Sequence, residues 1–114
     1  MGEYQRGDIV LVRFPFTDLR TTKLRPAVIV AVHGEDVIVV GVFATVPLTV
    51  PATWLRLDDS HPHFPQTGLK RSSVVKAEKL AILHRAIVDS RIGSLHPSLM
   101  SALNGLIKQA LHLP

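Results

Sequence analysis

The chain has 114 residues and no cysteine, which excludes a disulfide framework, a thiolate metal site and a cysteine nucleophile. With 46% hydrophobic and 19% charged residues, it has the composition of a globular protein with one core, which excludes an intrinsically disordered chain. The net charge of +4 is uneven, because residues 70–91 carry six basic and two acidic side chains; this favours a phosphate-bearing partner, although a merely soluble basic surface fits equally well.

The first half of the chain predicts β-strands. Val, Ile and Phe, which favour strands, dominate residues 8–14, 27–32 and 37–43. The polar residues 33–36 include a glycine and predict a hairpin turn between the second and third strands. No apolar stretch is long enough to cross a membrane and residues 1–7 lack the apolar core of a signal peptide, so we expect a cytoplasmic protein.

The second half predicts two further strands and a loop. The strands are expected at residues 52–57 and 72–77. Residues 58–68 contain two prolines and a glycine, and they are expected to form the loop that joins these strands. Residues 82–93 are compatible with a short strand or with a helical turn.

The end of the chain predicts a helix. Apolar residues between Leu99 and Leu111 recur at helical spacing and form one stripe. Pro97 suits the first helical turn, where its missing N–H donor costs nothing, and His96 is a weak N-cap. Five short antiparallel strands closed by a terminal helix predict a mainly β protein, a small curled barrel that forms a single domain over residues 1–114.

Five motifs follow one another in an order and spacing that point to a known family. Together they resemble the MazF/PemK family of toxins over about residues 6–111. The motifs are Gly7-Asp8-Ile9-Val10, Arg25-Pro26-Ala27-Val28-Ile29-Val30, Gly68-Leu69, Ser73-Val74-Val75-Lys76-Ala77-Glu78-Lys79-Leu80 and Ile92-Gly93-Ser94-Leu95.

The resemblance implies both a fold and an activity. The implied fold is an SH3-like barrel of five to seven antiparallel strands with a C-terminal α-helix, assembled as a homodimer. The implied activity is that of a type II toxin, a sequence-specific endoribonuclease that cuts single-stranded RNA through attack by the ribose 2′-hydroxyl and uses no metal or other cofactor. A cognate antitoxin protein is the implied partner that neutralises it.

Four residues are candidates for this chemistry, which needs a base, an acid and donors to the phosphate. Arg25 matches a family arginine, and its planar guanidinium suits two phosphate oxygens; the alternative is a surface arginine before a strand. Thr45 matches a family threonine that donates to the phosphate, although it is equally a β-branched strand end. Lys76 and Glu78 stand where PemK-like members carry an Arg and an Asp with acid and base roles.

Alternation along a strand puts Lys76 and Glu78 on one face and Val75 and Ala77 on the other. The pair is chemically competent as acid and base, since Lys donates a proton more readily than Arg. An ordinary exposed ion pair of little consequence is an equally weighted alternative.

Several basic and aromatic residues are candidates for RNA binding, although each base alone is also consistent with a solvated surface charge. Phe16 and Phe64 fall in predicted loops and are free to stack on bases, whereas Phe14, Phe43 and Trp54 are expected in the core. The basic candidates are Arg13, Arg20, Lys23, Lys70, Arg71 and Lys79.

Other functions stay open at this point. His61 and His63 beside Asp58 and Asp59 suggest a metal site, but a third well-spaced ligand is missing. Inhibition of another enzyme by protein contact, as in CcdB-like proteins, is a weaker hypothesis because the chain lacks their Trp-Gly-Ile tail. A MazF relative without catalysis is a further alternative, and an SH3-like peptide-binding module is weaker, because it would require an exposed aromatic groove.

Overall fold

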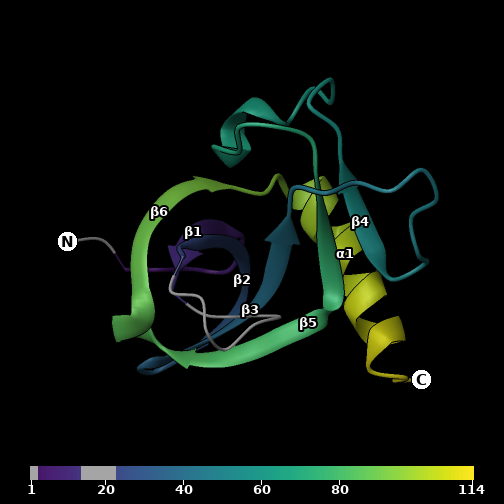
Figure 1. Cartoon of the computed structure of the whole chain (residues 1–114). Coiled ribbons are helices and arrows are strands. Elements are labelled where there is room, and N and C mark those ends of the chain that lie inside the picture. Colours follow the sequence, from purple (N-terminus) through teal and green to yellow (C-terminus); the bar gives the residue numbers. More distant parts are fainter. Residues whose placement is uncertain (1–2, 14–22) are drawn as a thin grey trace.

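The computed structural model describes residues 3–13 and 23–114 (Figure 1). In this part of the chain, six antiparallel strands form one sheet in the order β4-β5-β3-β2-β1-β6, and a C-terminal helix packs outside it. The strands are β1 (Asp8–Val12), β2 (Arg25–His33), β3 (Asp36–Phe43), β4 (Trp54–Leu57), β5 (Ser73–His84) and β6 (Val88–Ser94). The helix is α1 (Pro97–Ala110), and the short 3-10 helices are η1 (Pro65–Thr67) and η2 (Arg85–Ile87).

The sheet curls strongly, so that β6, β1, β2, β3 and β5 surround an interior (Figure 1). This confirms the predicted mainly β fold with a terminal helix. Two predictions needed extension, because β5 continues to His84 and residues 82–93 contain both a 3-10 turn and a sixth strand. The sequence understated β5 because Glu78 and Lys79 interrupt its apolar pattern.

An irregularity in β5 accounts for that interruption. Val40 of β3 faces Leu80, but the next residue, Gly41, faces Lys76, so three residues of β5 have no partner on β3. One of them, Ala77, donates its N–H to the carbonyl of Thr53 instead, at 3.2 Å. Such bulges bend a strand and redirect its side chains. The two halves of β5 therefore run in different directions (Figure 1).

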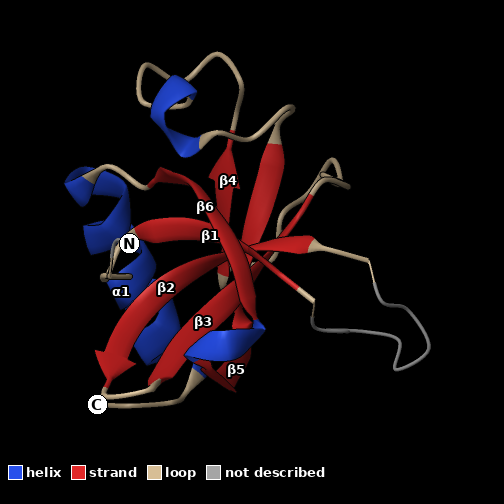
Figure 2. Cartoon of the chain, turned by 90° about the vertical axis from the view of Figure 1, so that its left-hand side faces the viewer, coloured by secondary structure: helices blue, strands red, loops and turns tan. Residues whose placement is uncertain are grey.

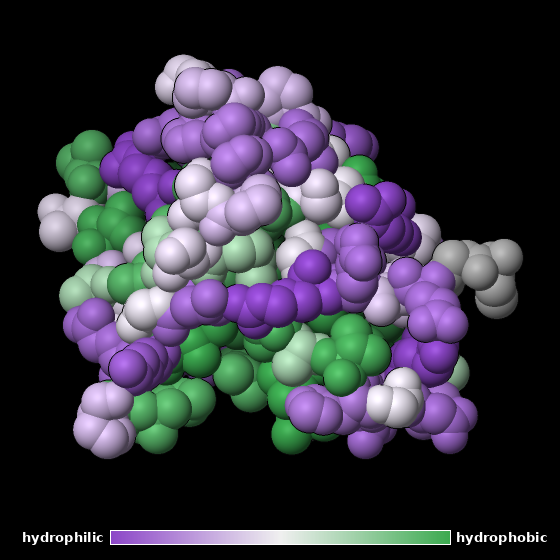
Figure 3. Space-filling model, turned by 180° about the vertical axis from the view of Figure 1, so that it is seen from behind, coloured by the Kyte–Doolittle hydropathy of each residue, from purple (hydrophilic) through white to green (hydrophobic). Residues whose placement is uncertain are grey.

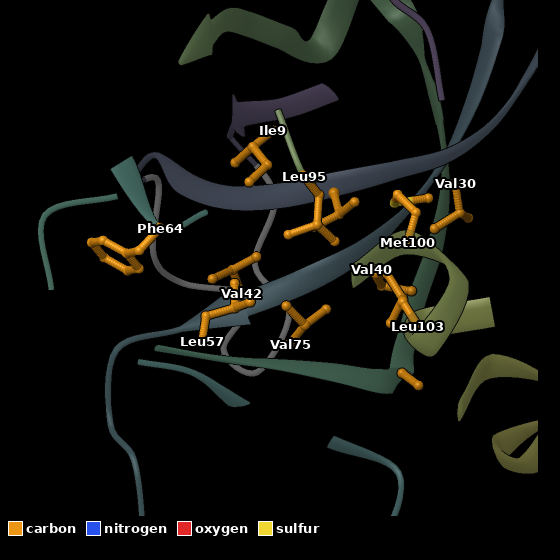
Figure 4. Close-up of a cluster of buried hydrophobic side chains, with 12 residues drawn as sticks. Ile9, Val30, Val40, Val42, Leu57, Phe64, Val75, Leu95, Met100 and Leu103 are labelled. Atoms are coloured by element: carbon orange, nitrogen blue, oxygen red, sulfur yellow. The ribbon is translucent and has the colours of Figure 1, made fainter. Parts of the chain in front are cut away.

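Alternation along the strands creates two buried clusters, one on each face of the sheet. The first lies under α1, where Met100 and Leu103 lie beside Val30 and Val40 (Figure 4). The second lies on the opposite face and consists of Val10, Val12, Ala27, Ile29, Val37, Val39, Leu83 and Val88. The hydrophobic effect on both faces fixes the register, because a slip by one residue would exchange the two clusters.

The Gly7-Asp8 motif has a structural role. Gly7 adopts a φ of 95°, which favours glycine, and its backbone N–H and carbonyl bond to Ile29 and Leu95. Asp8 is 2% exposed and accepts a 2.9 Å hydrogen bond from Nε of Arg91. This turn thus ties β1 to both of its neighbours in the sheet.

The segment 58–72 packs tightly against β6. A Cβ at Gly68 would lie 2.1 Å from the carbonyl oxygen of Ile92, and a Cβ at Gly93 would lie 2.3 Å from the Thr67 backbone. The Thr67 hydroxyl is buried and donates to the carbonyl of Phe64 at 2.7 Å. Figure 2 shows η1 above the ends of β4 and β6. Among the described residues, no helix is long and apolar enough to span a membrane.

Candidate functional site

Lys76 lies between two aromatic rings. Its Nζ is 4.3 Å from the ring centroid of Phe43 and 4.3 Å from that of Trp54. The register explains this arrangement, because Lys76 faces Trp54 on β4 and Gly41 on β3, and Phe43 is two residues further along the same face. Ring faces attract cations, so the ammonium is held in a defined position.

Glu78 is anchored next to Lys76 by two hydrogen bonds. The Thr53 hydroxyl donates to Oε1 at 2.7 Å, and Nε1 of Trp54 donates to Oε2 at 2.6 Å. Desolvation raises the pKa of Glu78, but the bonds from Trp54 and Thr53, a backbone bond and the charge of Lys76 outweigh it, and the pKa lies below its ordinary value of 4.5. Glu78 is therefore a fixed carboxylate at neutral pH.

Arg25 begins β2 and pairs with Val12 of β1. Lys76 faces Gly41 and Gly41 faces Ala27, so alternation places Arg25, two residues before Ala27, on the face that Lys76 occupies. Nε of Arg25 is buried and has no hydrogen-bond partner within residues 3–13 and 23–114. A buried donor without a partner costs free energy and is commonly matched by a ligand or by water.

The remaining predicted residues are more dispersed. Thr45 is exposed two residues beyond the end of β3, and Lys79 is half-buried in the bulge of β5. Arg13, just after β1, lines a shallow depression with η2 and the start of β6. Lys23 is exposed before β2. Phe16 and Arg20 lie outside the described residues.

Lys70 and Arg71 lie at the mouth of a pocket of about 280 Å³. The pocket lies at the end of the sheet where β1 and β3 end and β2 and β5 begin. Its walls are mainly apolar and include Leu11, Pro26, Leu69 and Ile92.

Three residues of the site were not identified from the sequence. Trp54 and Phe43 were expected in the core, but both are half-buried and present their rings to Lys76. Thr53 carries no sequence signal for its bond to Glu78. Conversely, Phe64 was expected to be free for stacking, and this was wrong: it is 9% exposed and belongs to the core under α1.

Three histidines meet between the segment 58–72 and α1. The rings of His63 and His96 stack with their centroids 3.5 Å apart, and His61 accepts a hydrogen bond from the His63 N–H. Desolvation, the charge of His96 and that of His61 lower the pKa of His63. His96 also caps α1 by accepting from the Ser98 N–H. Across residues 3–13 and 23–114, no group of three or more His, Asp or Glu side chains has a metal-binding arrangement.

Together, the fold and the site define a small β protein with a C-terminal helix, and with basic side chains and an apolar pocket at one end of its curled sheet. The family model for the PemK-like, MazF-like toxin of type II toxin-antitoxin systems matches residues 5–111, and the chain belongs to this family. A search of curated proteins found no match.

Solved structures agree with this assignment. An endoribonuclease in complex with its cognate antitoxin from a mycobacterial species is 25% identical with a TM-score of 0.74, and the alignment covers 98% of each chain. The Mycobacterium tuberculosis toxin MazF-mt6 is 24% identical with a TM-score of 0.73, over 94% of this chain and 98% of that one. MazF from Deinococcus radiodurans shares the fold at 15% identity, with a TM-score of 0.73 over 96% and 97% of the two chains.

Proposed function

We propose that this protein is a cytoplasmic toxin that cleaves single-stranded RNA at specific sequences without a metal ion. The observation that carries the proposal is the shared face of Arg25 and Lys76. On this face a buried guanidinium Nε has no hydrogen-bond partner among the described residues, and Trp54 holds the lysine beside the carboxylate of Glu78. The endoribonuclease activity named for a mycobacterial relative supports it.

The reaction assigned to this site is attack of a ribose 2′-hydroxyl on the adjacent phosphorus. The O2′–P bond forms, the P–O5′ bond breaks, and the products are a 2′,3′-cyclic phosphate and a free 5′-hydroxyl. The 2′-hydroxyl loses a proton to a base, and the leaving 5′-oxygen gains one from an acid. These proton transfers are carried out by side chains and need no metal ion.

Each residue has a role in this scheme. Glu78 takes the proton of the 2′-hydroxyl; its oxygens accept hydrogen bonds from Thr53, Trp54 and a backbone N–H, and a carboxylate has about four acceptor sites, so room for one further donor remains. Lys76 protonates the 5′-oxygen. Arg25 stabilises the charge that develops on the phosphorane, because its Nε is desolvated and available to an acceptor. Thr45, exposed at the end of β3, donates to a phosphate oxygen.

Two protein partners complete the proposal, a second copy of the chain and a cognate antitoxin. Relatives have been crystallised with their antitoxins. Large apolar side chains are exposed at the end of β2, on β5 and after α1, and they offer surface for both contacts. They are Val32, Ile82, Leu111 and Leu113, which are 41–66% exposed. Figure 3 shows apolar surface on both sides of a polar band on the rear face.

A second candidate function is a toxin relative that keeps its partners but has lost catalysis. The observation that favours it is that Lys76 and Glu78 are already engaged with Trp54, Phe43 and Thr53, as an inert structural pair would be.

The test is cleavage of a long mixed-sequence RNA by the purified protein in EDTA, mapped by primer extension. We expect discrete cuts that leave 5′-hydroxyl ends, at least about 100-fold slower with Arg25→Ala. Arg56→Ala is the matched control, because it removes the same charge from an exposed pair with Asp58. Intact RNA together with tight antitoxin binding would favour the non-catalytic alternative.

A further inference from the structure

We infer that the pocket beneath Lys70 and Arg71 binds one base of the RNA, that of a nucleotide adjoining the phosphate held by Arg25. The inference rests on the proposed function and adds to it a physical basis for sequence preference. None of the lining residues belongs to the catalytic set.

The size and lining of the pocket fit a single planar, largely apolar group. Its volume of about 280 Å³ is just below the range of roughly 300–1,000 Å³ that is usual for larger ligands. Leu11, Pro26, Leu69 and Ile92 supply apolar surface, on which the face of a base gains contact. The Ser73 hydroxyl donates its proton to the carbonyl of Arg71 but can still accept a hydrogen bond from a base edge.

The position of the pocket links it to the candidate site. Pro26 directly follows Arg25, and Ala44 directly precedes Thr45, so these neighbours are about 3.8 Å apart between Cα atoms. Leu11 likewise precedes Val12, the pairing partner of Arg25. Successive strand residues point to opposite faces. A single RNA strand that crosses this end of the sheet therefore has a phosphate at Arg25 and a neighbouring base over the pocket.

Charge favours RNA over an uncharged occupant. Lys70 and Arg71 are exposed at the mouth of the pocket, where they meet the phosphates on either side of an inserted base. Apolar walls with a cationic rim match a nucleotide, which has a planar ring and an anionic backbone.

The pocket is also preformed. Gly68 packs against the Ile92 backbone, Thr67 is fully buried, and the Ser73 hydroxyl donates to the carbonyl of Arg71 at 2.9 Å. A rigid wall discriminates between bases of different shape, because it cannot adjust to a poor fit.

The first experiment uses wild-type protein with labelled Leu and Ile methyl groups and an RNA whose 2′-hydroxyls are methylated, so that it cannot be cut. We expect saturable shifts at Leu11, Leu69 and Ile92. An abasic site at one position of this RNA should abolish them while shifts near Lys76 persist. A short acidic peptide serves as the comparison ligand, and shifts caused by the peptide but not by RNA would assign the pocket to a protein partner and overturn the inference.

The second experiment fills the pocket with Leu69→Phe and maps the cuts. We expect loss of base preference at one position beside the cut and about 10-fold slower cleavage of the best site. Ile87→Phe, an exposed apolar position on η2, is the matched control. Thermal melting of both variants checks that they fold.

The outcomes separate this inference from the proposed function. Two results would refute the pocket and leave the nuclease intact. One is RNA cleavage by the wild-type protein without methyl shifts at the pocket. The other is an unchanged cleavage motif in a folded Leu69→Phe protein. Methyl shifts with uncleavable RNA, but no cleavage of ordinary RNA, would support the pocket and refute the nuclease.

Discussion

Trp54 contacts two charged groups of the candidate site, Lys76 and Glu78. Its indole N–H bonds to Glu78, and its ring face holds the ammonium of Lys76. A tryptophan is suited to this double role because it combines an N–H donor with the aromatic face that binds cations best. The spacing between Lys76 and Glu78 is therefore set by a residue that takes no part in the proton transfer proposed for them.

Replacing Trp54 with Phe should separate these contacts. The variant keeps a ring for Lys76 but removes a donor to Glu78, so the pKa of Glu78 should rise toward 4.5. A carboxyl group whose pKa is lowered by folding stabilises the fold at pH values above its ordinary pKa. This stabilisation is lost as the pH falls through the lowered pKa. NMR titration of the Glu78 carboxyl carbon and acid unfolding would measure both effects.

Thr53→Val removes the other hydrogen-bond donor and should shift the pKa of Glu78 in the same direction.

The Trp54→Phe variant should cleave RNA more slowly, while its binding of the RNA substrate changes little. Identical titration curves for Glu78 in the variants and the wild type would contradict the role given to these donors.

The sequence predicted that Lys76 and Glu78 are neighbours but did not predict the aromatic rings beside them. Both residues contact Trp54. The partners of this pair come from β3 and the start of β4, and their approach depends on the register of three strands, which a local pattern does not contain. Phe64 and Trp54 were misjudged for the same reason, because burial depends on what packs over a segment.

At the scale of elements, the fit between the segment 58–72 and β6 should depend on the absence of a side chain at Gly93. Gly93→Ala would place a Cβ 2.3 Å from the Thr67 backbone, so we expect a loss of about 2 kcal/mol or more in unfolding free energy. Gly105→Ala is the control, because a Cβ at this helical position would meet no other described part of the chain within 4 Å, and this variant should gain about 1 kcal/mol in unfolding free energy. Urea unfolding measures both; equal effects would argue against the tight packing.

The stacked histidines should make the contact between the segment 58–72 and α1 sensitive to pH. Because the pKa of His63 is lowered, the folded protein binds fewer protons than the unfolded chain just below pH 6.5, and stability falls as the pH drops through this window. His63→Phe keeps a ring against His96 without a charge, so its melting temperature should change less between pH 7 and pH 5. His33→Phe, at an exposed position, controls for loss of a histidine. If the melting temperature of His63→Phe changes as much between pH 7 and pH 5 as that of the wild type, the effect is disproved.

Element types and order were predictable from the sequence because they follow from local periodicity. Strand-rich segments, the hairpin turn at 33–36 and the terminal helix all appear where expected. The full length of β5 was not predictable, since its bulge is stabilised by a bond from Ala77 to Thr53 on another part of the chain.

At the scale of the whole molecule, basic residues on the two faces of the sheet, at the same end of it, should bind one RNA strand together. Replacing Lys70 and Arg71 by Ala should weaken binding and reduce the slope of log affinity against log salt by about 0.7 for each phosphate that is no longer neutralised. Lys108→Ala on α1 should leave the slope unchanged. Fluorescence anisotropy with uncleavable RNA at several salt concentrations measures it, and equal slopes for all proteins would exclude these residues from the RNA path.

The bulge in β5 has a consequence for how this gene can vary. Residues before it, such as Val75, fill the cluster under α1, and residues after it, such as Leu83, fill the opposite cluster. Regular alternation would put residues eight positions apart on the same face, so the unpaired residues between Lys76 and Leu80 are what lets one strand fill both cores. Deleting one of these codons would leave Val75 and Leu83 seven positions apart, which a regular strand already directs to opposite faces, so both the bulge and the connection between β3 and β4 should tolerate such a change in natural descendants of this gene.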